Sequence, residues 1–309
     1  MWQTTFFDGE FSAGVINVAS VPKLSPFRYP GGKTWFVPYI RRWLDPVTRQ
    51  MYNFSPLRPA RFIEPFLGGG SISLTVAAED LVPGVIMAEI DADVAAVWQT
   101  VLQEENAVWL AHRIVTYTLT PEGVARLLGE RPATLHERAF QTIVRNRVNR
   151  GGILAPGAGQ LKFGEAGKGI LSRWYPETLA RRIRHILSLR KSLTFLHGDG
   201  FSLLTDYAGD PNAVFFIDPP YTAGKNGKRA GQRLYTYSDL DHEKLFRLVS
   251  RLQGDFLITY DNTQEVRELA RTYGLDMRLV PMKNTHHANI MELLIGRDLS
   301  WLKLSQPAD

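Results

Sequence analysis

Phe62-Ile63-Glu64-Pro65-Phe66-Leu67-Gly68-Gly69-Gly70-Ser71 is the stretch of sequence that decides the fold. Residues 61–66 are typical of a short strand and residues 71–78 of a helix, and three glycines lie between them. Glycine at such a turn permits positive φ and lets the backbone approach a ligand, and the free amides at the start of the helix attract anionic groups. The stretch predicts a strand, a ligand-binding loop and a helix, with a tight turn that binds nothing as the alternative.

A second strand and a second helix follow at the spacing of a nucleotide-binding unit. Residues 85–89 form an apolar run that ends on Glu89, 19 residues after Gly70, and a helix starts near Asp93. An acid at this position can accept hydrogen bonds from a ribose diol. Ser73 stands where a dinucleotide-binding sequence has its third glycine, which weakens the case for a pyrophosphate site and leaves room for a nucleoside-type cofactor. Residues 61–103 therefore predict half of a doubly wound α/β sheet.

The rest of the chain continues this sheet around a helical region. A helix is expected after Lys33, through residues 36–43, and residues 45–60 are expected to form a loop because they contain three prolines. Residues 104–150 are expected to be mostly helical, 151–170 to be exposed glycine-rich loops, and 176–190 to be a basic helix. We expect strands at 193–196, 213–217, 256–260 and 291–295, and a helix at about 241–252. The predicted domains are a catalytic domain of residues 1–103 and 191–309, interrupted by an inserted subdomain of residues 104–190.

Composition excludes several kinds of site. The chain has 309 residues, 44% hydrophobic, enough for a sizeable core. It has no cysteine, which excludes disulfides, thiolate metal sites and cysteine nucleophiles. No metal site is expected. No signal peptide or membrane-spanning stretch is evident, so we expect a cytoplasmic protein without membrane contact.

Positive charge is concentrated in the inserted region. Residues 131–190 contain twelve Lys or Arg and three acids, a net charge of +9, whereas the whole chain carries +5 and the remainder therefore −4. A basic region on an acidic body is typical of a surface that binds a polyanion. A solvated basic face without a partner is the alternative.

Asp218-Pro219-Pro220-Tyr221 follows a buried strand and has the residues for one particular reaction. Ligands of open α/β sheets bind at the carboxyl ends of strands. The Asp218 carboxylate and the Pro219 carbonyl can each accept one hydrogen of an adenine N6 amine, whose lone pair is otherwise delocalised into the ring. The prolines stiffen the loop, and Tyr221 can stack on the base. Methyl transfer to this amine needs positioning and electrostatics only, with the base flipped out of the duplex.

Taken together, these motifs resemble the Dam-type, alpha-class DNA N6-adenine methyltransferases. The matching pieces occur in the order of that family and cover about residues 25–297. They are residues 27–33 (FRYPGGK), 62–71 (FIEPFLGGGS), 88–93 (AEIDAD), 218–221 (DPPY) and 291–295 (MELLI). The resemblance implies a Rossmann-like S-adenosylmethionine-dependent methyltransferase sheet, mostly parallel with an antiparallel carboxyl-terminal strand. It also implies that the helical insert recognises double-stranded DNA.

The resemblance also implies roles for individual residues. Catalysis is expected of Asp218, Pro219, Pro220 and Tyr221. Binding of S-adenosylmethionine is expected of Tyr29, Lys33, Phe66, Gly68, Gly70, Glu89, Asp199, Phe201 and Asp218, with Glu89 standing where the family usually has Asp. DNA contacts are expected of Arg28, Arg145, Asn146, Arg147, Asn149 and Arg150, more of them to phosphates than to bases.

Three further interpretations stay open at this point. The amine acceptor is a cytosine N4 or a glutamine amide in related enzymes, although Asp218 favours adenine. A catalytically silent DNA-binding homologue is the alternative from another class. A partner restriction endonuclease fits the resemblance, as do a solitary or phage role, and we expect a monomer or weak dimer. The base-reading residues of the insert do not align with the family, so the sequence predicts no recognition site.

Overall fold

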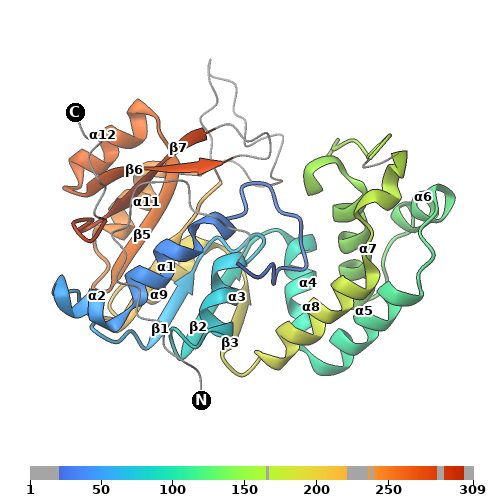
Figure 1. Ribbon diagram of the computed structural model, residues 1–309, viewed down its shortest axis with the longest axis horizontal. Coiled ribbons are helices and arrows are strands. Elements are labelled where there is room, and N and C mark those ends of the chain that lie inside the picture. Colours follow the sequence, from blue (N-terminus) through green and yellow to red (C-terminus); the bar gives the residue numbers. More distant parts are fainter. Residues whose placement is uncertain (1–20, 165–166, 221–235, 237–239, 284–288, 303–309) are drawn as a thin grey trace.

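A seven-stranded sheet forms the centre of the molecule (Figure 1). The computed structural model describes residues 21–164, 167–220, 236, 240–283 and 289–302. The strand order is β3-β2-β1-β4-β5-β7-β6, with β1 to β5 parallel and β7 antiparallel to both β5 and β6. This order confirms the expected Rossmann-like methyltransferase sheet. The strands are β1 (Arg61–Glu64), β2 (Gly84–Glu89), β3 (Leu193–His197), β4 (Ala213–Ile217), β5 (Asp255–Asp261), β6 (Asp276–Lys283) and β7 (Asn289–Gly296).

Helices cover both faces of the sheet, as its apolar strands require. Neighbouring strand residues alternate between the two cores: Phe216 belongs to one and Phe215 to the other. The first face is covered by α1 (Val37–Leu44), α3 (Ser71–Ala78) and α4 (Ala92–Leu102), and the second by α9 (Gly200–Asp206), α11 (His242–Val249) and α12 (Gln264–Thr272).

The inserted region is helical and packs beside the first face. In Figure 1 it lies to the right of the sheet. Its buried residues, such as Ile114 and Phe140, belong to the same core as Trp98 of α4. The insert therefore shares its core with the central sheet. It comprises α5 (Glu104–Thr116), α6 (Pro121–Gly129), α7 (Leu135–Val148), the 3-10 turns η3 (Arg150–Gly152) and η5 (Gly169–Arg173), and α8 (Pro176–Ser188).

Four elements differ from the sequence prediction, and one of them is helix α12, which was not predicted. Residues 45–60 are not all loop, because α2 (Pro46–Met51) begins with a proline at its first position and is capped by Asp45, which accepts from the Thr48 amide at 2.9 Å. Helix α9 was not predicted and begins directly after Asp199, which caps it. Strand β6 was also not predicted; it contains Pro281, which is tolerated because β6 is an edge strand.

Candidate active site

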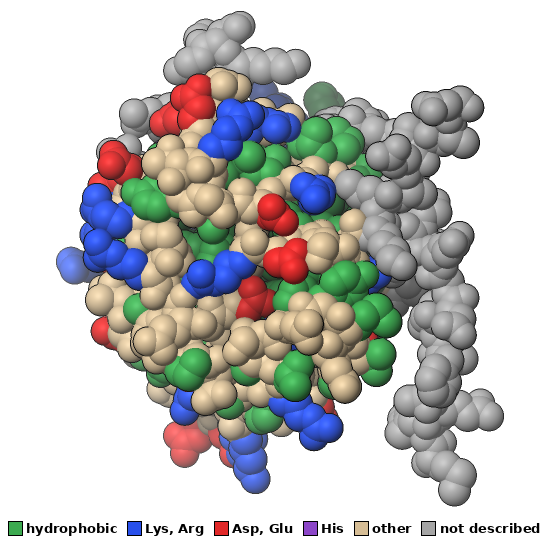
Figure 2. Space-filling model, turned by 90° about the vertical axis from the view of Figure 1, so that its left-hand side faces the viewer, with side chains coloured by type: hydrophobic (Ala, Val, Ile, Leu, Met, Phe, Trp, Pro, Cys, Tyr) green, Lys and Arg blue, Asp and Glu red, His purple; other side chains and the backbone are tan. Residues whose placement is uncertain are grey.

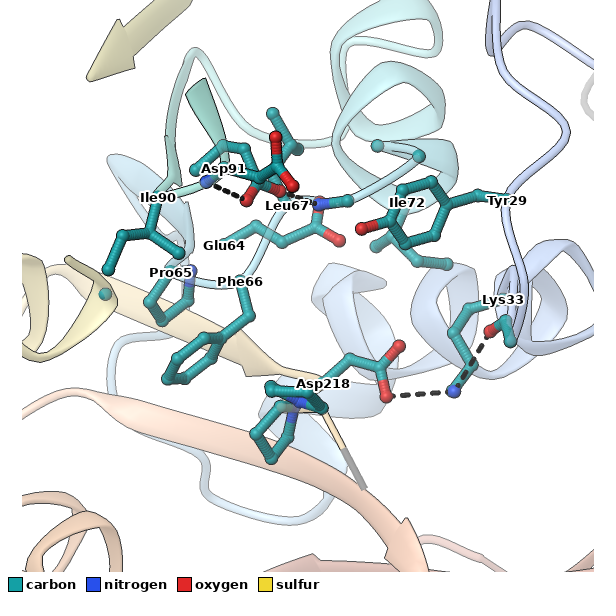
Figure 3. Close-up of a pocket in the computed structure, with 18 of the residues that line it drawn as sticks. Tyr29, Lys33, Glu64, Pro65, Phe66, Leu67, Ile72, Ile90, Asp91 and Asp218 are labelled. Carbon is teal, nitrogen blue, oxygen red and sulfur yellow. Dashed lines mark hydrogen bonds and ion pairs between the residues drawn. The ribbon is translucent and has the colours of Figure 1, made fainter. Parts of the chain in front are cut away.

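One pocket of about 250 Å³ lies at the carboxyl ends of β1, β2 and β4. It is bounded by the glycine loop, the segment before α1, and the loop after β4 (Figure 3). Parallel strands end at the same edge of a sheet, so three sequence-distant segments meet there. The predicted site residues that line it are Tyr29, Lys33, Phe66, Gly68, Gly70, Glu89, Asp199, Phe201, Asp218, Pro219 and Pro220.

Two glycines of the loop require backbone conformations that other residues adopt only with strain. Gly68 has φ +47° and Gly70 has φ +61°. A Cβ on Gly68 would lie 2.6 Å from Cε1 of Tyr29, and one on Gly70 would lie 2.7 Å from the Trp98 ring. The Trp98 indole donates to the Gly68 carbonyl at 3.1 Å. The loop is thus fixed from both sides, and its main chain forms one wall of the pocket.

Glu89 ends β2 inside the pocket and is held by the backbone around it. Its carboxylate accepts from the Gly68 amide at 2.9 Å and from the Asp91 amide at 2.8 Å. Burial raises the pKa of Glu89 to about 7, against the lowering effect of these hydrogen bonds. The same acid therefore stabilises the glycine loop and presents a carboxylate to the pocket.

The raised pKa of Glu89 predicts pH-dependent binding of a cationic ligand that hydrogen-bonds this carboxylate. Such a ligand favours the ionised form, so binding releases a proton, and affinity increases as pH rises through about 7. We expect Kd for S-adenosylmethionine to fall about tenfold between pH 6 and pH 8, measured by titration calorimetry. In Glu89→Gln the protein's part of this dependence should vanish; an equally steep profile in that variant would show that another group titrates.

Glu64 is a pocket residue that the sequence analysis did not single out. It ends β1, is buried, and accepts hydrogen bonds from the amide and the hydroxyl of Ser73. Burial raises the pKa of Glu64 to about 8, with the Asp218 carboxylate adding to the effect. Ser73, which replaces the third glycine of the dinucleotide pattern, is thus the partner of this acid. An acid that closes an apolar strand directly before Pro65 is the signal that could have found it.

Asp218 follows β4 and is oriented by residues from two other segments. Its Oδ1 atom lies 2.9 Å from Lys33 Nζ and accepts from the Thr259 hydroxyl at 2.8 Å. Lys33 is buried and also pairs with Glu292 of β7 at 3.1 Å. Figure 3 shows Asp218 and Lys33 joined on one side of the pocket, facing Tyr29 and Glu64 on the other. Glu292 is a second residue that sequence reasoning missed.

The lining of the pocket is rich in acids. Five carboxylates and one lysine lie among its described residues: Glu64, Glu89, Asp91, Asp199, Asp218 and Lys33. Such an environment disfavours a pyrophosphate and suits a ligand that carries positive charge. The pocket therefore fits S-adenosylmethionine, which combines a nucleoside, a sulfonium and an ammonium group, better than a dinucleotide.

Asp199 and Phe201 meet the pocket on the side of α9. Asp199 caps α9 by accepting from the Phe201 amide at 3.1 Å. The Phe201 ring packs edge-on against Phe66 with 6.2 Å between ring centroids. The two rings form an apolar wall beside the glycine loop, suited to a planar base.

Tyr221 lies outside the described part of the chain, as do the basic residues that follow it at 225, 228 and 229. Its catalytic role stays a prediction.

Comparison with known proteins shows distant structural similarity. No protein-family model matches the sequence, and no curated protein does. A proposed RNA methyltransferase of Pyrococcus horikoshii is similar with 9% identity and a TM-score of 0.36, over 88% of this chain and 87% of that one. A precorrin-6y C5,15-methyltransferase of Geobacter metallireducens has 10% identity and a TM-score of 0.30, over 77% and 80%. The methyltransferase domain of bacterial CtHen1 has 8% identity and a TM-score of 0.32, over 84% and 99%. The fold is therefore assigned from the strand order of the chain itself.

The predicted DNA-binding residues divide into a buried and an accessible group. Asn146, Arg147 and Asn149 are buried and donate to backbone carbonyls, so their side chains stabilise the insert in this structure. Arg145 is half-buried and pairs with Asp93 at 2.8 Å. Arg150 is exposed and Arg28 is half-buried. The side chains of these last two residues reach the surface, and their DNA contacts stay a prediction.

The face that lies away from the insert does not share the excess of positive charge that the sequence places in the insert. Figure 2 shows acidic and basic side chains interspersed there, without a patch of one sign. Within the described ranges, no helix has the length and apolar character needed to cross a membrane. The same residues contain no group of three acids or histidines arranged to hold a metal ion.

Proposed function

We propose that the protein is a DNA adenine N6-methyltransferase that uses S-adenosylmethionine. The observation that carries the proposal is that the Asp218 carboxylate lines the same pocket as Gly68 and Glu89. A methyl-acceptor site and a cofactor site must adjoin for direct transfer, because the reacting atoms need to meet at roughly 3 Å. Had Asp218 stood apart from the glycine loop, its motif would be only a proline turn.

The chain's contribution to the reaction is to hold the acceptor amine. S-adenosylmethionine supplies, when bound, an electrophilic methyl group on a sulfonium. Asp218 and the Pro219 carbonyl accept the two N6 hydrogens, which favours a tetrahedral nitrogen with its lone pair directed at that methyl. The cofactor would supply the methyl group for a new N–C bond and would keep the electron pair of its S–C bond on sulfur, while one N6 proton would pass to solvent. Lys33 and Thr259 fix Asp218 in the orientation this requires.

The basic insert supports DNA as the substrate. Its net charge of +9 over residues 131–190 lies beside the pocket-forming sheet, and Arg150 and Lys162 are exposed on it. Phosphate contacts from such residues position the duplex without reading its sequence.

This basic insert predicts a steep salt dependence of DNA binding. We expect the affinity to fall about a hundredfold between 50 and 200 mM salt, measured by fluorescence anisotropy. Arg150→Ala should lower the log–log slope by about one, whereas Arg251→Ala, an exposed arginine after α11, should leave it unchanged. A flat salt response, or an equal change in both variants, would exclude the insert as the DNA surface.

Transfer of a labelled methyl group, followed by digestion of the product to nucleosides, tests the proposed activity. N6-methyl-2′-deoxyadenosine from double-stranded DNA is the expected product. N4-methyl-2′-deoxycytidine, or transfer to protein only, would assign another acceptor to the same site. Calorimetric titration identifies a silent homologue, which gives no heat with S-adenosylmethionine but still binds DNA.

A further inference from the structure

Residues 25–33, here called the strap, connect the inserted region to the pocket. At one end the strap lies against α7, η3 and α8. At the other it places Tyr29 against the glycine loop and Lys33 beside Asp218. No motif argument assigns a role to the contacts between the strap and the insert.

Asn146 of α7 makes the most specific of these contacts. It is fully buried, its Oδ1 atom accepts from the Arg28 amide at 2.9 Å, and its Nδ2 atom donates to the Arg28 carbonyl at 2.9 Å. The same Nδ2 group donates to the Gly152 carbonyl at 2.7 Å. A single amide thus binds both backbone groups of one strap residue and also joins the strap to η3. Asp cannot donate these bonds and an apolar side chain cannot form them.

Other groups of the insert reinforce this junction. Arg147 of α7 donates to the Pro26 carbonyl, and Arg182 of α8 donates to the Ser25 carbonyl at 3.0 Å. Gly152 has φ +75°, and a Cβ there would lie 1.9 Å from the Arg28 carbonyl oxygen. The backbones of η3 and the strap therefore approach so closely that only glycine fits.

The pocket end of the strap is packed with equal closeness. A Cβ on Gly69 would lie 2.7 Å from Cβ of Tyr29, and the Gly68 position is similarly filled by the Tyr29 ring. Lys33 pairs with Asp218 five residues after Arg28. Displacement of the strap at Arg28 must therefore move groups that line the pocket, since interiors are close-packed and transmit strain.

We propose that Asn146 is a positioning residue that sets Tyr29 and Lys33 in the pocket through the strap. The adjoining Asn149–Gly152 segment is thereby tied to the geometry of the cofactor site. This inference rests on the proposed function only for the identity of the ligand. Asn146 itself does not line the pocket.

Asn146→Ala, with Gln141→Ala as its matched control, tests the proposal. Gln141 is a buried amide of the same helix that donates to two backbone carbonyls, of Leu127 and Glu130, but does not touch the strap. We expect Kd for S-adenosylmethionine to rise roughly tenfold in Asn146→Ala, the equivalent of one or two lost hydrogen bonds, and to change less than twofold in Gln141→Ala. Wild-type affinity in both variants overturns the proposal, and so does the same loss of affinity in both.

A pair of glycine variants addresses the same junction if Asn146→Ala does not fold. Gly151 and Gly152 both have positive φ, but a Cβ on Gly151 meets only Ile153 at 3.6 Å. Gly152→Ala should weaken S-adenosylmethionine binding, whereas Gly151→Ala, with a similar backbone strain, should not. Similar losses in the two variants would contradict a role for the strap.

Hydrogen exchange gives a readout that does not depend on the ligand. The amides of Gly32 and Phe36 bond to the carbonyls of Tyr29 and Lys33, at the pocket end of the strap. They should exchange roughly tenfold faster in Asn146→Ala and at wild-type rate in Gln141→Ala. Unchanged exchange overturns the proposal. Absence of S-adenosylmethionine binding by the wild type, with faster exchange in Asn146→Ala, would instead contradict the proposed function alone.

Discussion

Asp218→Ala is expected to lower methyl transfer at least about a thousandfold, because it removes one of the two acceptors that orient the N6 amine. The fold should persist, since Lys33 keeps its pairing with Glu292 and its hydrogen bond to the Gly31 carbonyl. DNA affinity should change little, because the basic insert is untouched. Single-turnover transfer of labelled methyl groups, with DNA binding measured on the same preparation, checks both expectations.

Asp261→Asn is the matched control for Asp218→Ala. Asp261 ends β5, the neighbouring strand, at the same edge of the sheet, but does not line the pocket. Its substitution should leave the rate within about tenfold of wild type, since it alters charge near the site without removing the acceptor. Comparable losses in both variants would show that the edge needs negative charge rather than Asp218 itself.

Gly68→Ala is expected to weaken S-adenosylmethionine binding about a hundredfold, or about 2.7 kcal/mol. The residue has φ +47°, which costs an L-amino acid about 1–2 kcal/mol. The added Cβ also meets the Tyr29 ring at 2.6 Å, so the ring must move within the pocket. Titration calorimetry on the free protein measures the effect.

Gly129→Ala provides the comparison for Gly68→Ala. It ends α6, and a Cβ there meets nothing within 4 Å. The variant should bind S-adenosylmethionine like the wild type and have equal or greater thermal stability, because alanine favours helix. Wild-type affinity in Gly68→Ala would mean that the glycine loop is a tight turn without a ligand.

The sequence predicted those elements whose burial in the fold requires a recognisable pattern of apolar residues. Strands such as β4 are buried on both sides and read as unbroken apolar runs, and α3 was placed at its observed bounds. Strand β6 was missed because an edge strand with a proline lacks that pattern, and α2 because its proline occupies a position where helices accept it.

The sequence predicted the motif residues of the pocket but not the side chains that bind to them. Gly68, Glu89 and Asp218 stand at strand ends, where topology alone brings them together. Glu292 joins the site through an ion pair with Lys33. A local sequence pattern does not indicate which distant residues form such a pair. Asn146 and Arg147 were assigned to DNA from their chemical type, whereas the structure shows them buried and bound to the strap. Burial of a polar side chain depends on tertiary packing, which the sequence does not display.

A structure of the ternary complex with DNA and a non-reactive analogue of S-adenosylmethionine tests the central claim most directly. The account predicts a flipped adenine whose N6 atom lies about 2.6–3.2 Å from both an Asp218 carboxylate oxygen and the Pro219 carbonyl oxygen, beside an analogue bound against Gly68 and Glu89. A base that stays in the duplex, or an N6 amine held by groups other than Asp218 and the Pro219 carbonyl, would contradict it.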